Sequence, residues 1–195
     1  MDDDLYKEIQ QKFSKGQLAK YPVMRTEMRT LDIFKGSQNV SSPSLYTGTI
    51  PRYMCLGVVT GGAFGGKLSL SPFNFRHNNM SKLTITVNGQ PILYRALECN
   101  FENGEYLMAY NTLFGKNFPT TGNGISMEDY LKGNTVYVLD FQRAMPNQLQ
   151  GDMEGTVGVE MTFAKPMEGI HTLVIMMQKQ CLIEIDKAGK VEVTC

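Results

Sequence analysis

The sequence predicts an all-β protein, an antiparallel sandwich or barrel of the jelly-roll kind. About eight to ten short segments alternate apolar and polar side chains with a period of two, as half-buried strands do. No long helical pattern separates them, as a βαβ architecture would require, and no internal repeat is present. An Asn-Gly pair joins two of the segments and is typical of a tight hairpin.

The first strands are predicted in the N-terminal half. Residues 24–34 alternate Arg25, Glu27 and Arg29 with apolar or small side chains, and the phase changes near Thr30 and Leu31. We interpret that change as a β-bulge. Residues 53–60 are mostly apolar, which predicts a strand covered on both faces.

The clearest local signal lies in residues 82–94. Apolar Leu83, Ile85 and Val87 alternate with polar residues, and Asn88-Gly89 then supplies the two positive-φ positions of a type I′ turn. Pro91 cannot donate a backbone hydrogen bond, so the returning strand is expected at a sheet edge.

The C-terminal half completes the strand set. Strands are predicted over 134–142, 155–164 and 170–178, with a closing hairpin over 181–193. In 155–164 one face is predicted to lie on the core and the other in water. The core face comprises Val157, Val159, Met161 and Phe163, and the water face comprises Thr156, Gly158, Glu160 and Thr162.

Two helices are expected. Residues 126–131 begin at Ser126 with Asp129 three residues later, an acidic variant of the capping box, inside the long connection 111–133. Near the N-terminus, apolar residues at helical spacing predict a short helix over residues 3–15, either packed or loosely docked. We therefore expect an N-terminal helical arm over 1–20 and a single jelly-roll domain over 21–195.

The composition narrows the class of protein. Acidic and basic residues number 19 each, so no basic excess supports direct nucleic-acid binding through broad phosphate neutralisation. No stretch approaches the roughly 20 apolar residues of a membrane span, and the acidic N-terminus is unlike a signal peptide. The chain is expected to be soluble and non-secreted, or a piece of a longer protein.

Cys55, Cys99 and Cys181 are interpreted as ordinary buried or half-buried thiols in a reducing compartment.

A glycine-rich loop over residues 61–67 matches most of a phosphate-binding P-loop. Leu68 follows Lys67 where the motif needs Ser or Thr, and a strand-like segment with Pro72 replaces the helix. The loop is therefore interpreted as a flexible connection between strands.

No other pattern predicts catalysis, a metal site or a cofactor. His77 and His171 are the two histidines and lie far apart in sequence, whereas a zinc centre needs three or four ligands. Clustered carboxylates occur only at Asp2–Asp4 and Glu128–Asp129, which do not resemble a glycosidase pair. Four aromatic residues at four-residue spacing suit a carbohydrate platform or, as we favour, core packing beneath a loop. These aromatic residues are Tyr106, Tyr110, Phe114 and Phe118.

Residues 48–92 carry a set of short motifs. The stretch is similar to a segment of proteins encoded by Maverick/Polinton-type elements and related adintoviruses, which reads "G-x-L-P-x-R", "AF-x-G", "NPFNF" and "VDGQ". The matching residues are Gly48, Pro51, Arg52, Ala63, Phe64, Gly66, Pro72, Phe73, Asn74, Phe75, Val87, Asn88, Gly89 and Gln90. Ser71 and Asn88 depart from the pattern but suit the same turns. The similarity continues in order over most of residues 15–193.

The resemblance implies a non-enzymatic structural protein. Those proteins are similar to major capsid proteins with two jelly-rolls in tandem, usually assembled as trimers, and this chain would correspond to the C-terminal jelly-roll. Expected partners are further copies, other capsid subunits and a missing N-terminal jelly-roll, with no membrane partner. The expected location is the virion, after synthesis in the host cytoplasm or nucleus. The alternative is a jelly-roll binding module that presents loops 61–80 and 111–133 to a carbohydrate or protein ligand.

The motif residues are expected to be structural or inter-subunit residues. In the stretch 69–79, Pro72 should set a bend that Phe73 and Phe75 fill. Asn74 and His77 should satisfy backbone groups there. Asn88 and Gly89 should form the hairpin turn.

Overall fold

The computed structural model describes residues 7, 11, 13–92, 96–114, 124–145 and 153–195. Most of the helix expected over 3–15, the aromatic residue Phe118 and part of the 111–133 connection lie outside these residues. The expectations for them stay predictions, as does the division into residues 1–20 and 21–195.

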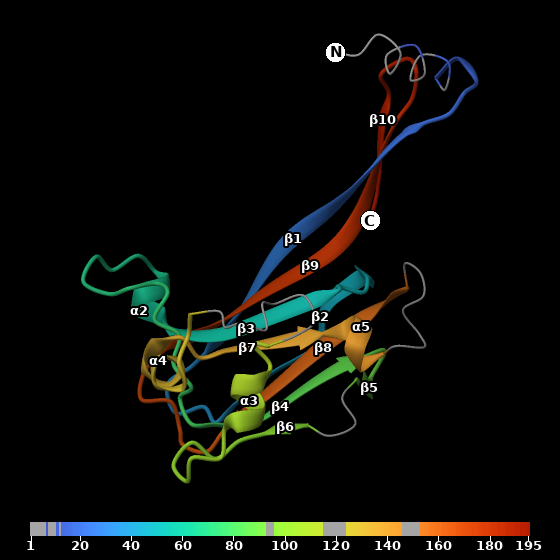
Figure 1. Ribbon diagram of the computed structural model, residues 1–195. Helices are drawn as coiled ribbons and strands as arrows, with labels where there is room; N and C mark the ends of the chain where they lie inside the picture. Colours follow the sequence, from blue (N-terminus) through green and yellow to red (C-terminus); the bar gives the residue numbers. More distant parts are fainter. Residues whose placement is uncertain (1–6, 8–10, 12, 93–95, 115–123, 146–152) are drawn as a thin grey trace.

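Two antiparallel sheets of five strands each form the body of the protein (Figure 1). The first sheet has the order β1 (Ala19–Ile33), β9 (His171–Ile185), β3 (Tyr53–Thr60), β7 (Val136–Asp140), with β10 (Val191–Thr194) also beside β9. The second has the order β2 (Asn39–Thr49), β8 (Glu154–Phe163), β4 (Met80–Val87), β5 (Gln90–Pro91), with β6 (Leu97–Glu98) also beside β4.

The strand pairs are nested along the chain. β1 pairs with β9, β2 with β8, β3 with β7 and β4 with β5, all antiparallel. The first strand therefore lies beside one of the last, and successive pairs alternate between the two sheets. This pairing defines a jelly-roll and confirms the predicted all-β antiparallel sandwich.

One hydrophobic core fills the space between the sheets. Val157, Val159, Met161 and Phe163 of β8 are at most 2% exposed, so the predicted inward face of this strand is confirmed. They meet apolar residues of the first sheet such as Leu56 and Ile175, which are fully buried. The opposite face of β8 differs in part from the prediction. Gly158 is buried, because the Pro43 carbonyl lies where a side chain would stand.

The predicted β4–β5 hairpin is confirmed. Asn88 and Gly89 have φ values of 52° and 78°, and Val87 pairs with Gln90 across them. Pro91 lies in the short edge strand β5. The turn is also tied to β8, because the Thr156 amide donates to Asn88 Oδ1 over 2.9 Å.

The described helices are short. They are α2 (Gly61–Phe64), α3 (Leu107–Asn111), α4 (Met127–Gly133) and α5 (Phe141–Ala144). α4 begins at Ser126 with the complete capping box to Asp129, as predicted. The glycine loop over 61–67 differs from the prediction of a plain flexible connection, because its first residues form α2. The Gly65 amide closes this turn by donating to the Gly61 carbonyl.

β1 and β9 continue past the body as a long twisted pair of strands (Figure 1). β3 accompanies β9 only as far as Gln178, and β10 takes its place beside residues 182–185. We call residues 19–25, 179–185 and 191–194 the extension. The segments expected as a strand over 170–178 and the start of a hairpin at 181 are one continuous strand, β9.

The expected bulge near Thr30 and Leu31 is wrong. β1 pairs with β9 without interruption from Ala19 to Ile33. Odd-numbered residues of β1 share one face throughout. That face is apolar where it packs on the core at Leu31 and Ile33, and it becomes charged at Arg25 and Glu27, where the strand leaves the body.

Candidate assembly surfaces

The corner after α2 is held by backbone hydrogen bonds. The Phe75 amide donates to the Gly133 carbonyl over 2.8 Å, and the Thr135 amide donates to the Phe75 carbonyl over 3.0 Å. The Arg76 amide donates to the Val58 carbonyl over 3.1 Å. These bonds join β3, the corner and the end of α4.

The four motif residues of the corner, 72–75, differ in packing and exposure. Phe75 lies across Gly57, where a Cβ atom would stand 2.6 Å from its ring. Asn74 packs its side chain against Gly133 in the same way. Pro72 is exposed, and Phe73 is 76% exposed, so the expectation that Phe73 fills the corner is wrong. Phe73 belongs to a local turn in which its amide donates to Ser71 Oγ over 3.3 Å.

His77 has a structural environment. Its ring stacks on Phe101 with centroids 4.2 Å apart, and its Nδ1 accepts a hydrogen bond from the Asn79 amide. Burial lowers the pKa of His77, and the charge of Arg76 lowers it further. His171 is buried, with Nδ1 3.0 Å from the Gly169 carbonyl oxygen. Each histidine thus has its own separate local partners.

The aromatic residues of the loop pack on the core. Phe101, Tyr106, Tyr130, Tyr110 and Phe114 follow one another in a chain of ring contacts. The favoured expectation of core packing is confirmed for Tyr106, Tyr110 and Phe114. Within the described residues, no group of three or more His, Cys, Asp or Glu side chains could hold a metal ion.

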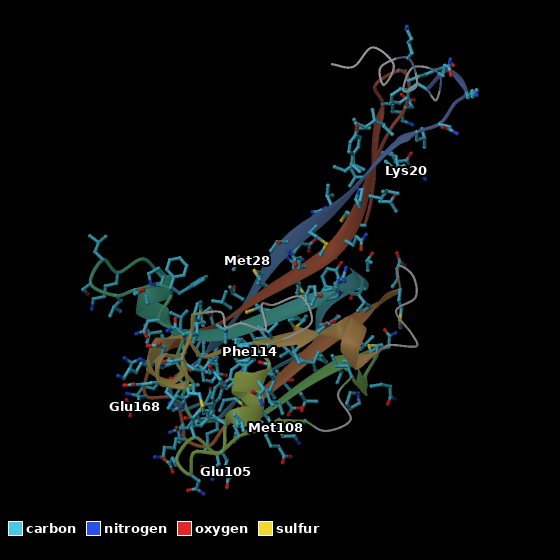
Figure 2. All side chains as sticks on the ribbon, in the orientation of Figure 1. Lys20, Met28, Glu105, Met108, Phe114 and Glu168 are labelled. Carbon is cyan, nitrogen blue, oxygen red and sulfur yellow. A yellow bond between two sulfur atoms is a disulfide. The ribbon has the colours of Figure 1, made fainter. Side chains whose placement is uncertain are left out.

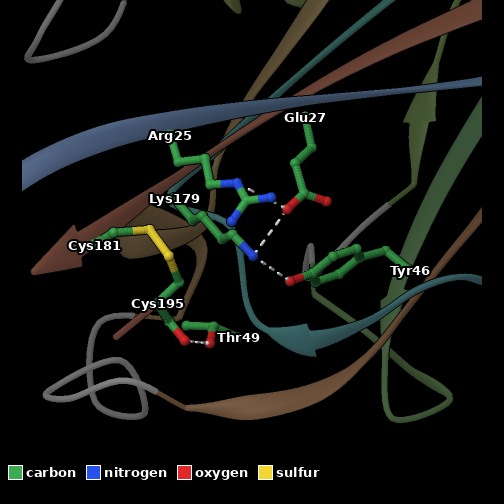
Figure 3. The surroundings of a disulfide bond; sticks show 7 residues. All are labelled: Arg25, Glu27, Tyr46, Thr49, Lys179, Cys181 and Cys195. Atoms are coloured by element: carbon green, nitrogen blue, oxygen red, sulfur yellow. Dashed lines mark hydrogen bonds and ion pairs between the residues drawn. A yellow bond between two sulfur atoms is a disulfide. The ribbon is translucent and has the colours of Figure 1, made fainter. Parts of the chain in front are cut away.

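A charged cluster holds the base of the extension against the second sheet. Lys179 Nζ lies 3.0 Å from Glu27 Oε1 and donates to Tyr46 Oη over 3.0 Å (Figure 3). The Lys179 and Glu27 side chains are only 12% and 18% exposed. The hydrogen bond from Lys179 lowers the pKa of Glu27. The cluster therefore links β1 and β9 of one sheet to β2 of the other.

A disulfide joins Cys181 to Cys195 next to this cluster (Figure 3). The expectation that Cys181 is an ordinary thiol is therefore wrong, whereas Cys55 and Cys99 are free, as expected. Thr49 on β2 donates a hydrogen bond to the Cys195 carbonyl. The disulfide and this bond fasten the end of β10 to both sheets.

Two surfaces each expose several large apolar side chains. The first is the tip after β3, residues 61–73, where Phe64, Leu68, Leu70 and Phe73 are exposed. The second is the extension with the adjoining part of β1 (Figure 2). Its exposed apolar residues are Tyr21, Met24, Met28, Val191 and Val193. Soluble monomers rarely expose large contiguous apolar patches, so these surfaces are candidates for contacts with other chains.

The sequence reasoning missed the cluster and the disulfide. The disulfide had a signal, because the closing hairpin places residue 182 opposite 194 and therefore 181 opposite 195. The cluster had none, because Tyr46 lies 133 residues from Lys179 in sequence.

Within the described residues, no helix is long and apolar enough to cross a membrane.

The fold belongs to the class of antiparallel jelly-rolls, and comparison with known proteins agrees. The chain aligns over 92% of its length with the crystal structure of the mavirus major capsid protein, with a TM-score of 0.51 and 11% identity. It aligns over 97% of its length with the quasi-atomic model of the PBCV-1 virus capsid, with a TM-score of 0.54 and 9% identity. It covers 41% and 54% of those chains, so it spans about half of each. At these identities the likeness is one of fold.

The sequence also matches a curated protein. It is 28% identical over 110 residues to an uncharacterised protein of Caenorhabditis elegans. The aligned segment covers 56% of this chain and 26% of the relative. No family model matches the sequence. The antiparallel jelly-roll is thus established as a fold, by the strand order and by the structural alignments.

Proposed function

We propose that this chain is a structural jelly-roll module of a viral or virus-like capsid protein of the Maverick/Polinton kind. The observation that carries the proposal is the nested jelly-roll, which aligns with major capsid proteins over nearly the whole chain. The motifs that resemble Maverick/Polinton and adintovirus proteins support the finer assignment.

In this proposal the protein works by assembly and has no catalytic activity. The two sheets bury their apolar faces in one core, which makes a rigid unit whose edges and loops contact other subunits. Symmetric repetition of one contact then closes a ring or shell. The exposed apolar residues at 61–73 and on the extension support such contacts.

The proposed partners are further copies of the chain, in a trimer, and other capsid subunits in the virion. A second jelly-roll is also proposed, because the chain covers only 41% and 54% of the capsid chains with which it aligns. Pro72, Phe73, Asn74, Phe75, Asn88 and Gly89 would act as structural or contact residues. The exposed ring of Phe73 suits a contact role, and the half-buried ring of Phe75 suits a structural one.

Light scattering coupled to size exclusion, with negative-stain microscopy of the same fractions, tests the proposal. Trimers, larger rings or particles that form as the protein concentration rises are the expected result. A strict monomer at every concentration would overturn it, most directly if that monomer bound glycans through its loops.

A further inference from the structure

The outer edge of β1 is open. β1 is the end strand of the first sheet, and within the described residues its ladder partner is β9 alone. Its other edge therefore presents unpaired backbone N–H and C=O groups along a strand of 15 residues. Natural proteins usually shorten or cover such an edge, because it can pair with a strand of another chain.

The side chains of β1 are complementary to those of a second, antiparallel β1. When Thr26 of one copy lies opposite Thr26 of the other, every charge except Arg29 meets an opposite charge. Lys20 then faces Asp32, Arg25 faces Glu27 and Met24 faces Met28, each twice by symmetry, while Arg29 faces Val23. Opposite charges and paired apolar side chains stabilise antiparallel strands, whereas like charges directly opposite destabilise them.

The neighbouring registers lack this complementarity. In an antiparallel pair, directly opposed side chains lie on the same face of the sheet. A two-fold axis perpendicular to the sheet therefore places one residue opposite its own copy in the second strand. An axis at Arg25 places that residue opposite itself. An axis at Glu27 places two carboxylates together and Arg25 opposite Arg29. The axis at Thr26 alone among these three avoids like charges.

Several of the side chains involved are accessible, whereas Glu27 is 18% exposed because it pairs with Lys179. The Lys20 and Arg25 side chains are 60% and 58% exposed, and Met28 is 57% exposed. Lys20 and Met28 lie along β1 clear of the core (Figure 2). Lys20 also forms an ion pair with Glu184 of β9, with Nζ 2.7 Å from Oε1, and its side chain stays 60% exposed in that pair.

We infer that β1 is a self-association surface at which two copies pair antiparallel about Thr26. The extension of each copy then continues the first sheet of the other, because residues 19–25 of one strand lie beside residues 27–33 of its partner. Tyr21, 52% exposed here, comes to lie beside Leu31 of the second copy at the rim of that copy's core. Pro22 lacks an N–H group and faces Thr30, so the hydrogen-bonded segment is centred on residues 23–29.

This inference rests on the self-association in the proposed function and names its surface. Charge reversal at Lys20 and Asp32 tests it, by sedimentation velocity of the full chain. Lys20→Glu and Asp32→Lys should each weaken dimer formation roughly tenfold, because each variant places like charges opposite each other twice. A 1:1 mixture of the two variants should associate again, because every pair in the mixed dimer is then opposite in charge.

Cysteine cross-linking tests the register. Thr26→Cys should form a covalent dimer under dissolved oxygen, because directly opposed residues lie about 4.5–5.5 Å apart. Met24→Cys alone should not, whereas a mixture of Met24→Cys with Met28→Cys should. The parent chain is the control, since burial raises the pKa of the free thiols Cys55 and Cys99 to about 11 and leaves them unreactive.

The outcomes separate the two proposals. A parent chain that stays monomeric overturns both. A parent chain that assembles equally well with Lys20→Glu or Asp32→Lys overturns the β1 contact alone and assigns assembly to another surface, such as residues 61–73. Thermal melts of each variant confirm that a loss of association does not reflect unfolding.

Discussion

Lys179 and Glu27 hold the extension to the body, with Nζ and Oε1 3.0 Å apart on neighbouring strands. Glu27 is opposite Met177 in the ladder, so the ion pair runs diagonally from β1 to β9. Lys179 also donates to Tyr46 Oη on β2. The direction in which the extension leaves the body is therefore coupled to the second sheet.

Lys179→Met should lower the free energy of unfolding by roughly 1–3 kcal/mol, because the covered Glu27 carboxylate and Tyr46 hydroxyl both lose a charged partner. Urea denaturation measures the change. Lys187→Met, in the exposed turn before β10, is the matched control and should change stability by less than about 0.5 kcal/mol. Equal losses in both variants would contradict the assigned role of Lys179.

The destabilisation caused by Glu27→Gln should disappear in acid. The Lys179 hydrogen bond holds the pKa of Glu27 below its ordinary value. Its contribution to stability is therefore present above the unfolded pKa of about 4.3 and is lost as the pH falls through the folded pKa. The melting temperature of Glu27→Gln should lie below that of the parent chain near neutral pH and approach it below about pH 4. A difference independent of pH would refute the ion pair.

Reduction should destabilise the protein through Cys181 and Cys195 alone. The disulfide closes a loop with a sequence separation of 14, for which chain entropy predicts roughly 3 kcal/mol. Thermal melts with and without dithiothreitol measure the loss. Cys195→Ser should melt at the lower temperature under both conditions, whereas Cys99→Ser should still respond to the reductant.

Phe75→Ala and Phe73→Ala form a matched pair. Phe75 is half-buried against Gly57, so its loss should cost roughly 2 kcal/mol, about half the value for a fully buried phenylalanine. Phe73 is exposed, so its loss should change the stability of the isolated chain by less than about 0.5 kcal/mol. Chemical denaturation of both variants checks the order, and a larger cost at Phe73 would contradict the structure.

Two substitutions at Asn88 separate its two roles. Asn88→Gly keeps the positive φ easily but removes the acceptor of the Thr156 amide, which should cost about 1 kcal/mol. Asn88→Ala removes the acceptor and adds backbone strain at φ 52°, so it should cost about 2 kcal/mol. Equal melting temperatures for the two variants would show that the turn geometry carries no cost.

Signals that depend on neighbouring residues were predictive. The alternation in β8 identified its core face at Val157 and Phe163. Asn88-Gly89 identified a hairpin, and Ser126 with Asp129 identified the start of α4. In each case the physical cause, a strand period, a positive φ or a cap hydrogen bond, operates within a few residues of the chain.

Features that depend on distant residues were not predictive. The charges of β1 indicated a bulge, because the sequence does not reveal where a strand leaves the core. Two phenylalanines two residues apart, Phe73 and Phe75, looked equivalent until Gly57 provided a surface for one of them.

The all-β class, the hairpin and the capped helix could be predicted from the sequence, because local backbone preferences and the strand period of two depend on residues close together in the chain. The tertiary structure decided the nested strand order, the extension of β1 and β9, and the contacts of Lys179. Those features arise where segments more than a hundred residues apart, such as β1 and β9, are brought together by burial of a common core.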